Sequence, residues 1–182
     1  YLTVGPDLFS DGGMRRCVVS TLRALTAGRG KPMADIEAAR NFLTGDDRCT
    51  GKIGIIGFCM GGGFALATAN IGFDAAAANY GQLPKDFDEA FRGACPVVGS
   101  YGGKDVSLRG AAAKLEDALA ERDIAHDVKE YPSAGHSFLN DHYFGPAIMH
   151  PVQKIMHVGP DPVAARDAWD RIEAFFDTYL QN

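Results

Sequence analysis

The stretch IGIIGFCMGGGFALATAN, residues 53–70, constrains the fold of this 182-residue chain more than any other. It opens with an apolar run of the kind that forms a strand buried on both faces. It then passes through one cysteine, Cys59, and three consecutive glycines into a second apolar run. This order predicts a buried strand, a sharp turn that carries the cysteine, and a buried helix.

Strands and helices are predicted to alternate along the whole chain. The strand candidates are residues 1–4, 52–56, 75–79, 97–101 and 125–131, and the helix candidates are residues 14–26, 34–43, 60–69, 109–122 and 162–180. Asp161 is the expected N-cap of the last helix. Residues 140–159 are expected to form a long loop. The alternation predicts an α/β fold in which helices cover both faces of a mainly parallel sheet.

Composition narrows the class of protein. Hydrophobic residues make up 46% of the chain and charged residues 23%, which predicts one soluble domain over residues 1–182. The 18 basic and 23 acidic side chains give a net charge of -5. No nucleic-acid partner is expected, because phosphate binding needs clustered Lys and Arg. No apolar run approaches the roughly 20 residues of a membrane span, so no membrane partner is expected either.

The cysteines and the first residue bear on the location of the protein. The four cysteines are far apart and form no CxxC pair, so we expect free thiols in a reducing compartment, the cytoplasm. The chain opens on Tyr1 rather than Met and shows no basic-then-apolar leader. We therefore expect residues upstream of Tyr1 and no signal peptide. The histidines lack the spacing of a zinc site, and neither a metal nor a cofactor is expected.

Cys59 lies in a G-x-C-x-G motif with Gly57 and Gly61, which is the nucleophile-elbow pattern with sulfur in place of oxygen. Such a turn strains the backbone of the central residue and brings the flanking backbone so close that a Cβ would clash. The thiol would lie at a helix N-terminus, which favours thiolate over thiol. The amide of Met60 is then a candidate donor to an oxyanion. The alternative is a buried structural cysteine in a glycine-rich turn.

Asp105 and His136 follow Cys59 in the order nucleophile, acid, histidine that hydrolases of this architecture use. Each of the two is predicted to follow a strand, and the carboxyl ends of parallel strands meet at one edge of a sheet. The three side chains are therefore expected to gather at that edge. Taken singly, an Asp in a turn is a turn former and a His in a loop is a surface residue. The hypothesis depends on their joint occurrence.

With these residues in place, the chain resembles the dienelactone hydrolase family of α/β-hydrolases over almost its whole length. The matching segments are PDLF (6–9), GFCMGG (57–62), NYG (79–81), GSYGGKD (99–105) and AGHSF (134–138). The resemblance implies that Cys59 is the nucleophile of a triad with Asp105 and His136. It also implies a substrate site lined by Tyr80, Phe58 and Phe138, with the Met60 amide as one oxyanion donor. The strands that open other family members lie before Tyr1, so we expect these N-terminal strands and the second oxyanion donor to be missing here.

The implied function is hydrolysis of small carboxylic esters, lactones or thioesters through an acyl-cysteine intermediate. The expected partner is the small-molecule substrate, and the expected state is a monomer or weak homodimer. The segment FLNDHYF after the His136 turn has no arginine to hold a substrate carboxylate, which argues against dienelactone itself. Two alternatives remain open: a non-catalytic binding domain of the same fold, and a redox-responsive thiol protein.

Overall fold

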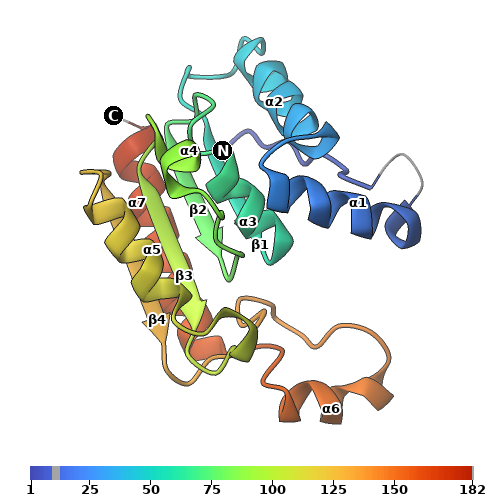
Figure 1. Cartoon of the computed structure of the whole chain (residues 1–182). Coiled ribbons are helices and arrows are strands. Elements are labelled where there is room, and N and C mark those ends of the chain that lie inside the picture. Colours follow the sequence, from blue (N-terminus) through green and yellow to red (C-terminus); the bar gives the residue numbers. More distant parts are fainter. Residues whose placement is uncertain (10–12, 182) are drawn as a thin grey trace.

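The computed structural model describes the backbone of residues 1–9 and 13–181, and the side chains of all of these except residues 13–16. In this part of the chain, four strands form one sheet in the order β1-β2-β3-β4, and each neighbouring pair is parallel (Figure 1). The strands are β1 (Gly54–Phe58), β2 (Ala75–Asn79), β3 (Val97–Gly102) and β4 (His126–Tyr131). Parallel register brings the carboxyl ends of all four strands to the same edge of the sheet.

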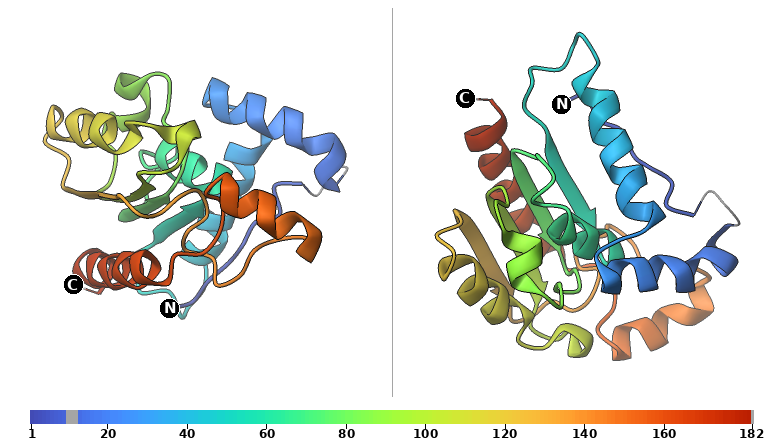
Figure 2. Two further views of the ribbon diagram at one scale, coloured as in Figure 1. Left: turned by 90° about the horizontal axis from the view of Figure 1, so that it is seen from below. Right: turned by 45° about the horizontal axis from the view of Figure 1, so that its top comes forward.

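Helices occupy both sides of this sheet, as the α/β prediction required. The α-helices are α1 (Gly13–Ala27), α2 (Lys31–Thr44), α3 (Met60–Ala67), α4 (Phe87–Phe91), α5 (Ala111–Ala120), α6 (His150–Ile155) and α7 (Pro162–Leu180), and the 3-10 turns are η1 (Val106–Leu108) and η2 (Ala147–Met149). Helix α7 lies on one side, and α1, α3 and α5 lie on the other (Figure 2). The predicted fold class is therefore confirmed.

Two apolar clusters hold the layers together. The cluster between the sheet and α3 and α5 includes Phe64, Leu66 and Leu115, each at most 1% exposed. The cluster beneath α7 includes Val98 and Ile172. Burial of one such side chain stabilises the fold by about 1.5–3 kcal/mol. Both clusters rest on alanine-rich β2, whose small side chains let helices approach the middle of the sheet from both faces.

Most of the predicted elements are present, with small shifts at their ends. Strand β2 and helix α7 have the predicted bounds, and β1 begins two residues later than predicted. Asp161 caps α7 as expected, because its carboxylate accepts a hydrogen bond from the amide of Ala164 at 3.2 Å. Among the described residues, no helix combines the length and the apolar character needed to cross a membrane.

The structure differs from the predicted elements in three places. The strand predicted at residues 1–4 is wrong: this segment pairs with no strand among the described residues, and the side chain of Tyr1 packs on α7 through Phe176 and Asp177. The loop predicted at residues 140–159 is wrong in part, since it contains η2 and α6. Helix α4 was missed, although Asp86 and Glu89 carry a capping signal that the structure uses.

The turn between β1 and α3 is built on close backbone contact. Cys59 has φ 55° and ψ -120°, a left-handed conformation that costs a non-glycine residue about 1–3 kcal/mol. A Cβ added at Gly57 would fall far inside van der Waals contact with the carbonyl of Gly61, and one at Gly62 would lie 2.7 Å from the carbonyl oxygen of Asn79. The expected crowding at Gly61 is wrong, because an added Cβ there meets nothing within 4 Å. The backbone of α3 at Gly61, and not the missing side chain of that glycine, sets the tightness of the turn.

Gly57→Ala should therefore destabilise the protein, and Gly61→Ala should not. We expect Gly57→Ala to lower the free energy of unfolding by about 3 kcal/mol or more, since backbone atoms must move to admit the methyl group. Gly61→Ala is the matched control: it should leave stability unchanged or raise it by up to about 1 kcal/mol, because alanine is the better helix former. Urea denaturation of both variants measures the difference, and equal stabilities would contradict the crowding seen at Gly57.

Candidate active site

Cys59 stands at the carboxyl end of β1 and directly precedes α3. Its amide donates a hydrogen bond to the carbonyl of Asn79 at 3.0 Å, and its carbonyl accepts one from the amide of Gly63 at 3.2 Å. The first bond ties the elbow to the end of β2, and the second starts the helix. The side chain is exposed, so the backbone is fixed while the sulfur remains open to a reactant.

Asp105 follows β3 through the turn at Gly102 and Gly103. The amide of Asp105 donates a hydrogen bond to the carbonyl of Gly102 at 3.1 Å, and the residue is only 4% exposed. The carboxylate caps the 3-10 turn η1: Oδ1 accepts the amide of Ser107 at 3.0 Å and the Ser107 hydroxyl at 2.6 Å. A buried carboxylate needs such donors, since its desolvation is otherwise costly.

His136 completes a chain of side-chain contacts with the other two residues. Its Nδ1 lies 2.6 Å from Oδ2 of Asp105, and its Nε2 lies 3.1 Å from Sγ of Cys59. The structure thus brings together all three side chains that the sequence predicted to meet. The carboxylate fixes a proton on Nδ1, which leaves Nε2 facing the sulfur.

The backbone around His136 is pinned to two other segments. Its amide donates to the carbonyl of His157 and its carbonyl accepts from the amide of Gly159, both at 2.9 Å. On the other side, a Cβ added at Gly102 would lie 2.5 Å from the carbonyl oxygen of Gly135. The turns that carry Asp105 and His136 are therefore pressed against each other, backbone to backbone.

This arrangement shifts the pKa values of the thiol and the imidazole toward an ion pair. The hydrogen bond from His136 is the main cause that lowers the pKa of Cys59, and the Met60 amide adds to it against the opposing effect of burial. Burial lowers the pKa of His136, but the contacts with Cys59 and Asp105 outweigh it and raise the pKa to about 9. Thiolate and imidazolium stabilise each other across the 3.1 Å contact.

The predicted substrate-lining aromatics occupy three different environments. Phe58 is 38% exposed beside Cys59, with its ring 5.9 Å from that of Trp169, a neighbour that no sequence signal identified. Tyr80 is 1% exposed, with its ring 5.1 Å from that of His136. Phe138 is 0% exposed behind Tyr80. The structure does not place Phe138 where a substrate could touch it, because apolar packing draws it into the core.

Tyr80 has an unfavourable backbone conformation and a buried hydroxyl without a partner. Its backbone has φ 40°, and its buried hydroxyl has no hydrogen-bond partner among the described residues. Burial raises the pKa of Tyr80, and the nearby charge of Cys59 raises it further. The hydroxyl therefore keeps its proton and is a buried donor without a partner among the described residues.

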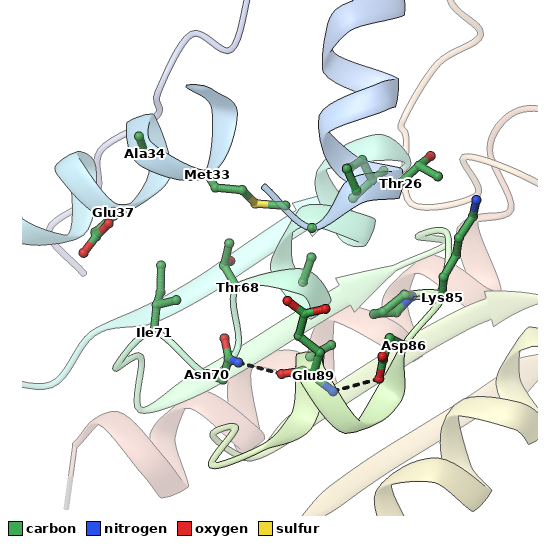
Figure 3. A pocket seen from close by; sticks show the side chains of 16 residues that line it. Thr26, Met33, Ala34, Glu37, Thr68, Asn70, Ile71, Lys85, Asp86 and Glu89 are labelled. Atoms are coloured by element: carbon green, nitrogen blue, oxygen red, sulfur yellow. Dashed lines mark hydrogen bonds between the residues drawn. The ribbon is translucent and has the colours of Figure 1, made fainter. Parts of the chain in front are cut away.

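Two hollows lie near the sheet, and they differ in their relation to Cys59. An apolar groove of about 330 Å³ follows β1 and is lined by Phe58 and Gly61, the residues on either side of the elbow. A separate hollow of about 260 Å³ lies among α1, α2, α3 and α4 (Figure 3). It is lined by exposed polar side chains such as Glu37 and Glu89. Neither hollow is lined by any of the three residues in the hydrogen-bonded chain, but the apolar groove reaches the neighbours of Cys59.

Known proteins resemble this chain in sequence and in fold. A carboxymethylenebutenolidase from Rhodococcus opacus is 31% identical over 150 residues, which cover 75% of this chain and 53% of that protein. A dienelactone hydrolase-like promiscuous phosphotriesterase from metagenomic libraries has a TM-score of 0.72 at 23% identity, covering 88% of this chain and 66% of that one. An α/β-hydrolase enzyme from a Medee basin deep-sea metagenome library has a TM-score of 0.62 at 17% identity, covering 84% of this chain and 66% of that one. At these identities the two structures show the shared fold.

The similarity covers nearly all of this chain but only part of the length of its relatives. The chain spans 43%, 53% and 63% of the length of three relatives named as carboxymethylenebutenolidases, so it corresponds to about half of such a protein. The model of the dienelactone hydrolase family matches residues 1–180, nearly the whole chain. The resemblance seen in the sequence is thereby confirmed: this chain belongs to the dienelactone hydrolase family.

Proposed function

We propose that the protein hydrolyses small, uncharged carboxylic esters, lactones or thioesters by way of an acyl-cysteine intermediate. The observation that carries the proposal is the continuous chain of contacts from Asp105 through His136 to the exposed sulfur of Cys59. The named relatives and the family support a hydrolase. The apolar groove beside Phe58 and Gly61 offers room for an uncharged substrate group.

In the first half of the reaction, the Cys59 thiolate attacks the substrate carbonyl carbon and a C–S bond forms. The electron pair of the C=O bond moves to its oxygen, and the amide of Met60 is placed to stabilise that charge. The intermediate then collapses, the bond to the leaving oxygen breaks, and the imidazolium of His136 gives its proton to that oxygen. An ester releases its alcohol, a thioester releases a thiol after the same step at its sulfur, and an opened lactone keeps its hydroxyl on the acyl group; in each case the acyl group stays on the sulfur of Cys59.

In the second half, Nε2 of His136 takes a proton from water as the water oxygen attacks the acyl carbon. The C–S bond breaks, the carboxylic acid leaves, and the thiolate–imidazolium pair is restored. Asp105 keeps the Nδ1 proton in place throughout, so that Nε2 can exchange protons with sulfur, leaving group and water in turn. Tyr80 is 1% exposed and its hydroxyl is buried, so the hydroxyl serves the oxygen of the reacting group only if a local movement opens it to the site.

The same cysteine supports one rival function. An exposed thiol of lowered pKa is also the kind that oxidises readily, which fits a redox-responsive protein. Such a protein would not need Asp105 and His136 to be aligned for proton transfer. Ester turnover and thiol reactivity therefore have to be measured side by side.

Turnover of a short-chain chromogenic ester, 4-nitrophenyl butyrate, tests the hydrolase directly. Cys59→Ala should abolish turnover, and His136→Ala should lower kcat by a factor of about 100 or more, because proton transfer is lost. Cys49→Ala removes a thiol that has no place in the hydrogen-bonded chain and is the matched control, with turnover unchanged. Turnover that survives Cys59→Ala would refute the acyl-cysteine mechanism.

The dependence of Cys59 alkylation on pH tests the ion pair without any turnover. Because contact with His136 lowers the thiol pKa, the alkylation rate of the wild type with iodoacetamide should fall less between pH 8 and pH 6.5 than that of His136→Ala. In His136→Ala the thiol pKa returns toward about 8.5, so only about one thiol in a hundred is ionised at pH 6.5, and alkylation there should be about a hundredfold slower than at pH 10. Mass spectrometry of the peptide that contains Cys59 follows the reaction. Equal profiles for the two proteins would show that His136 does not set the thiolate population.

Tyr80→Phe should separate stability from function. Removing a buried hydroxyl without a partner should raise the free energy of unfolding by about 1 kcal/mol, while kcat for the ester should fall by about tenfold if the hydroxyl serves the substrate oxygen. Tyr101→Phe is the matched control, since that hydroxyl is also buried without a partner among the described residues. It should gain stability and keep its turnover. A Tyr80→Phe variant with wild-type kcat would remove Tyr80 from the mechanism.

A further inference from the structure

The carboxylate of Asp105 divides its two oxygens between two partners. Oδ2 faces Nδ1 of His136 at 2.6 Å, whereas Oδ1 receives both the hydroxyl and the amide of Ser107, at 2.6 and 3.0 Å. Asp105 is 4% exposed, so its orientation is fixed by these contacts more than by bulk water. Ser107 itself is exposed, which leaves room for a larger or smaller side chain at that position.

We propose that Ser107 is a positioning residue, which orients the Asp105 carboxylate and through it sets the proton on His136 and the charge on Cys59. The inference rests on the proposed hydrolase function, but one of its two readouts requires no turnover. It extends the hydrogen-bonded chain from three residues to four, and the added residue touches neither sulfur nor substrate.

The hydroxyl, and not the amide, is what makes Ser107 specific. Asp105 is the N-cap of η1, so any residue except proline at position 107 would offer its amide to Oδ1. Without the hydroxyl, Oδ1 keeps one donor, the Ser107 amide, and Oδ2 keeps its contact with His136. The hydroxyl adds a second donor to Oδ1 from a different direction and further restricts rotation about the Cβ–Cγ bond, and a hydroxyl 2.6 Å from a charged oxygen is among the stronger donors. Serine and threonine are the residues that can supply both a backbone amide and a short side-chain hydroxyl to Oδ1 from position 107.

A competing effect of the hydroxyl has the opposite sign. The hydroxyl also draws charge away from the carboxylate, so its removal would strengthen the attraction between Asp105 and the imidazolium if orientation did not matter. The thiolate would then form at lower pH. Loss of alignment weakens that attraction, and the thiolate forms at higher pH. The thiolate of Cys59 and the imidazolium of His136 interact with each other and with two further titratable groups, Asp105 and Tyr80. None of these four residues is altered in the test.

The test compares Ser107→Ala, Ser107→Gly and Ser107→Thr with the wild type. Alkylation of Cys59 by iodoacetamide is measured from pH 6 to pH 9, together with kcat and KM for 4-nitrophenyl butyrate. Both variants without a hydroxyl should shift the alkylation midpoint to higher pH and lower kcat about fivefold, with KM unchanged, because the carboxylate acts through His136 and not on the bound substrate. Ser107→Thr should restore both readouts.

Ser133→Ala is the matched control. Its hydroxyl donates to a carboxylate oxygen of Asp161 at 2.9 Å, so the same kind of bond is deleted outside the hydrogen-bonded chain. This variant should keep the wild-type profile and kcat. Thermal unfolding of every variant shows whether the fold is intact.

Several outcomes would overturn the role of Ser107. An unchanged alkylation midpoint in the two variants without a hydroxyl, or a shift to lower pH, rules out positioning. So does a folded Ser107→Thr variant that behaves like Ser107→Ala. If the wild type does not turn over the ester at all, the proposed hydrolase function fails, while the alkylation profiles still decide the part played by Ser107.

Discussion

Close contact of backbone with backbone at glycine is the constraint on which this site depends. Each of the three turns that carry the reactive side chains has a glycine with no room for a Cβ: Gly57 in the cysteine turn, Gly102 in the aspartate turn and Gly135 in the histidine turn. Hydrogen bonds between side chains are directional, and they become weak when donor and acceptor move apart by about 1 Å. The contact between Gly102 and Gly135 places the aspartate turn directly against the histidine turn, whereas Gly57 is crowded by Gly61 of its own turn and Gly135 by His157.

Parallel register supplies the rest of the geometry. Strands β1, β3 and β4 end at the same edge of the sheet, so turns that are distant in the sequence become neighbours in space. The strain of Cys59 and Tyr80 is concentrated at this edge. Tyr80 follows β2, all of whose residues are buried, whereas Cys59 follows the partly exposed β1 and is held by its hydrogen bond to Asn79 at the end of β2. Rigid elements therefore carry the reactive groups, and the irregular segments extend beyond them.

The sequence contained enough information for the fold class and for the meeting of Cys59, Asp105 and His136. Those predictions depend on periodicity, glycine placement and strand order, all of which are local or topological. Strand formation at residues 1–4 could not be predicted correctly, because a strand requires a neighbour and local propensity says nothing about one. The contribution of Phe138 was misjudged for a related reason: proximity in sequence to His136 does not tell which way a ring packs.

Other parts of the site had a signal that was present but easily overlooked. Ser107 follows Asp105 at the spacing of an Asx-type turn, in which a side-chain oxygen meets the amide two residues on. The crowding at Gly62 in place of Gly61 depends on how the helix after the elbow packs on the end of β2, a tertiary contact that no motif encodes. Trp169 reaches Phe58 from a helix more than a hundred residues away, and only the folded chain reveals it.

The paired hydrogen bonds between His136 and residues 157 and 159 have an evolutionary consequence. They close residues 137–156 into a loop whose two ends lie beside His136, so the part of this loop beyond the buried Phe138 and Leu139 can vary without moving the imidazole. Lengthening such a loop lowers the free energy of unfolding only slightly, since the entropic cost of closing a loop grows with the logarithm of its length. Natural variation, or a graft in the laboratory, can therefore remodel the surroundings of the reactive sulfur while the reacting groups keep their alignment.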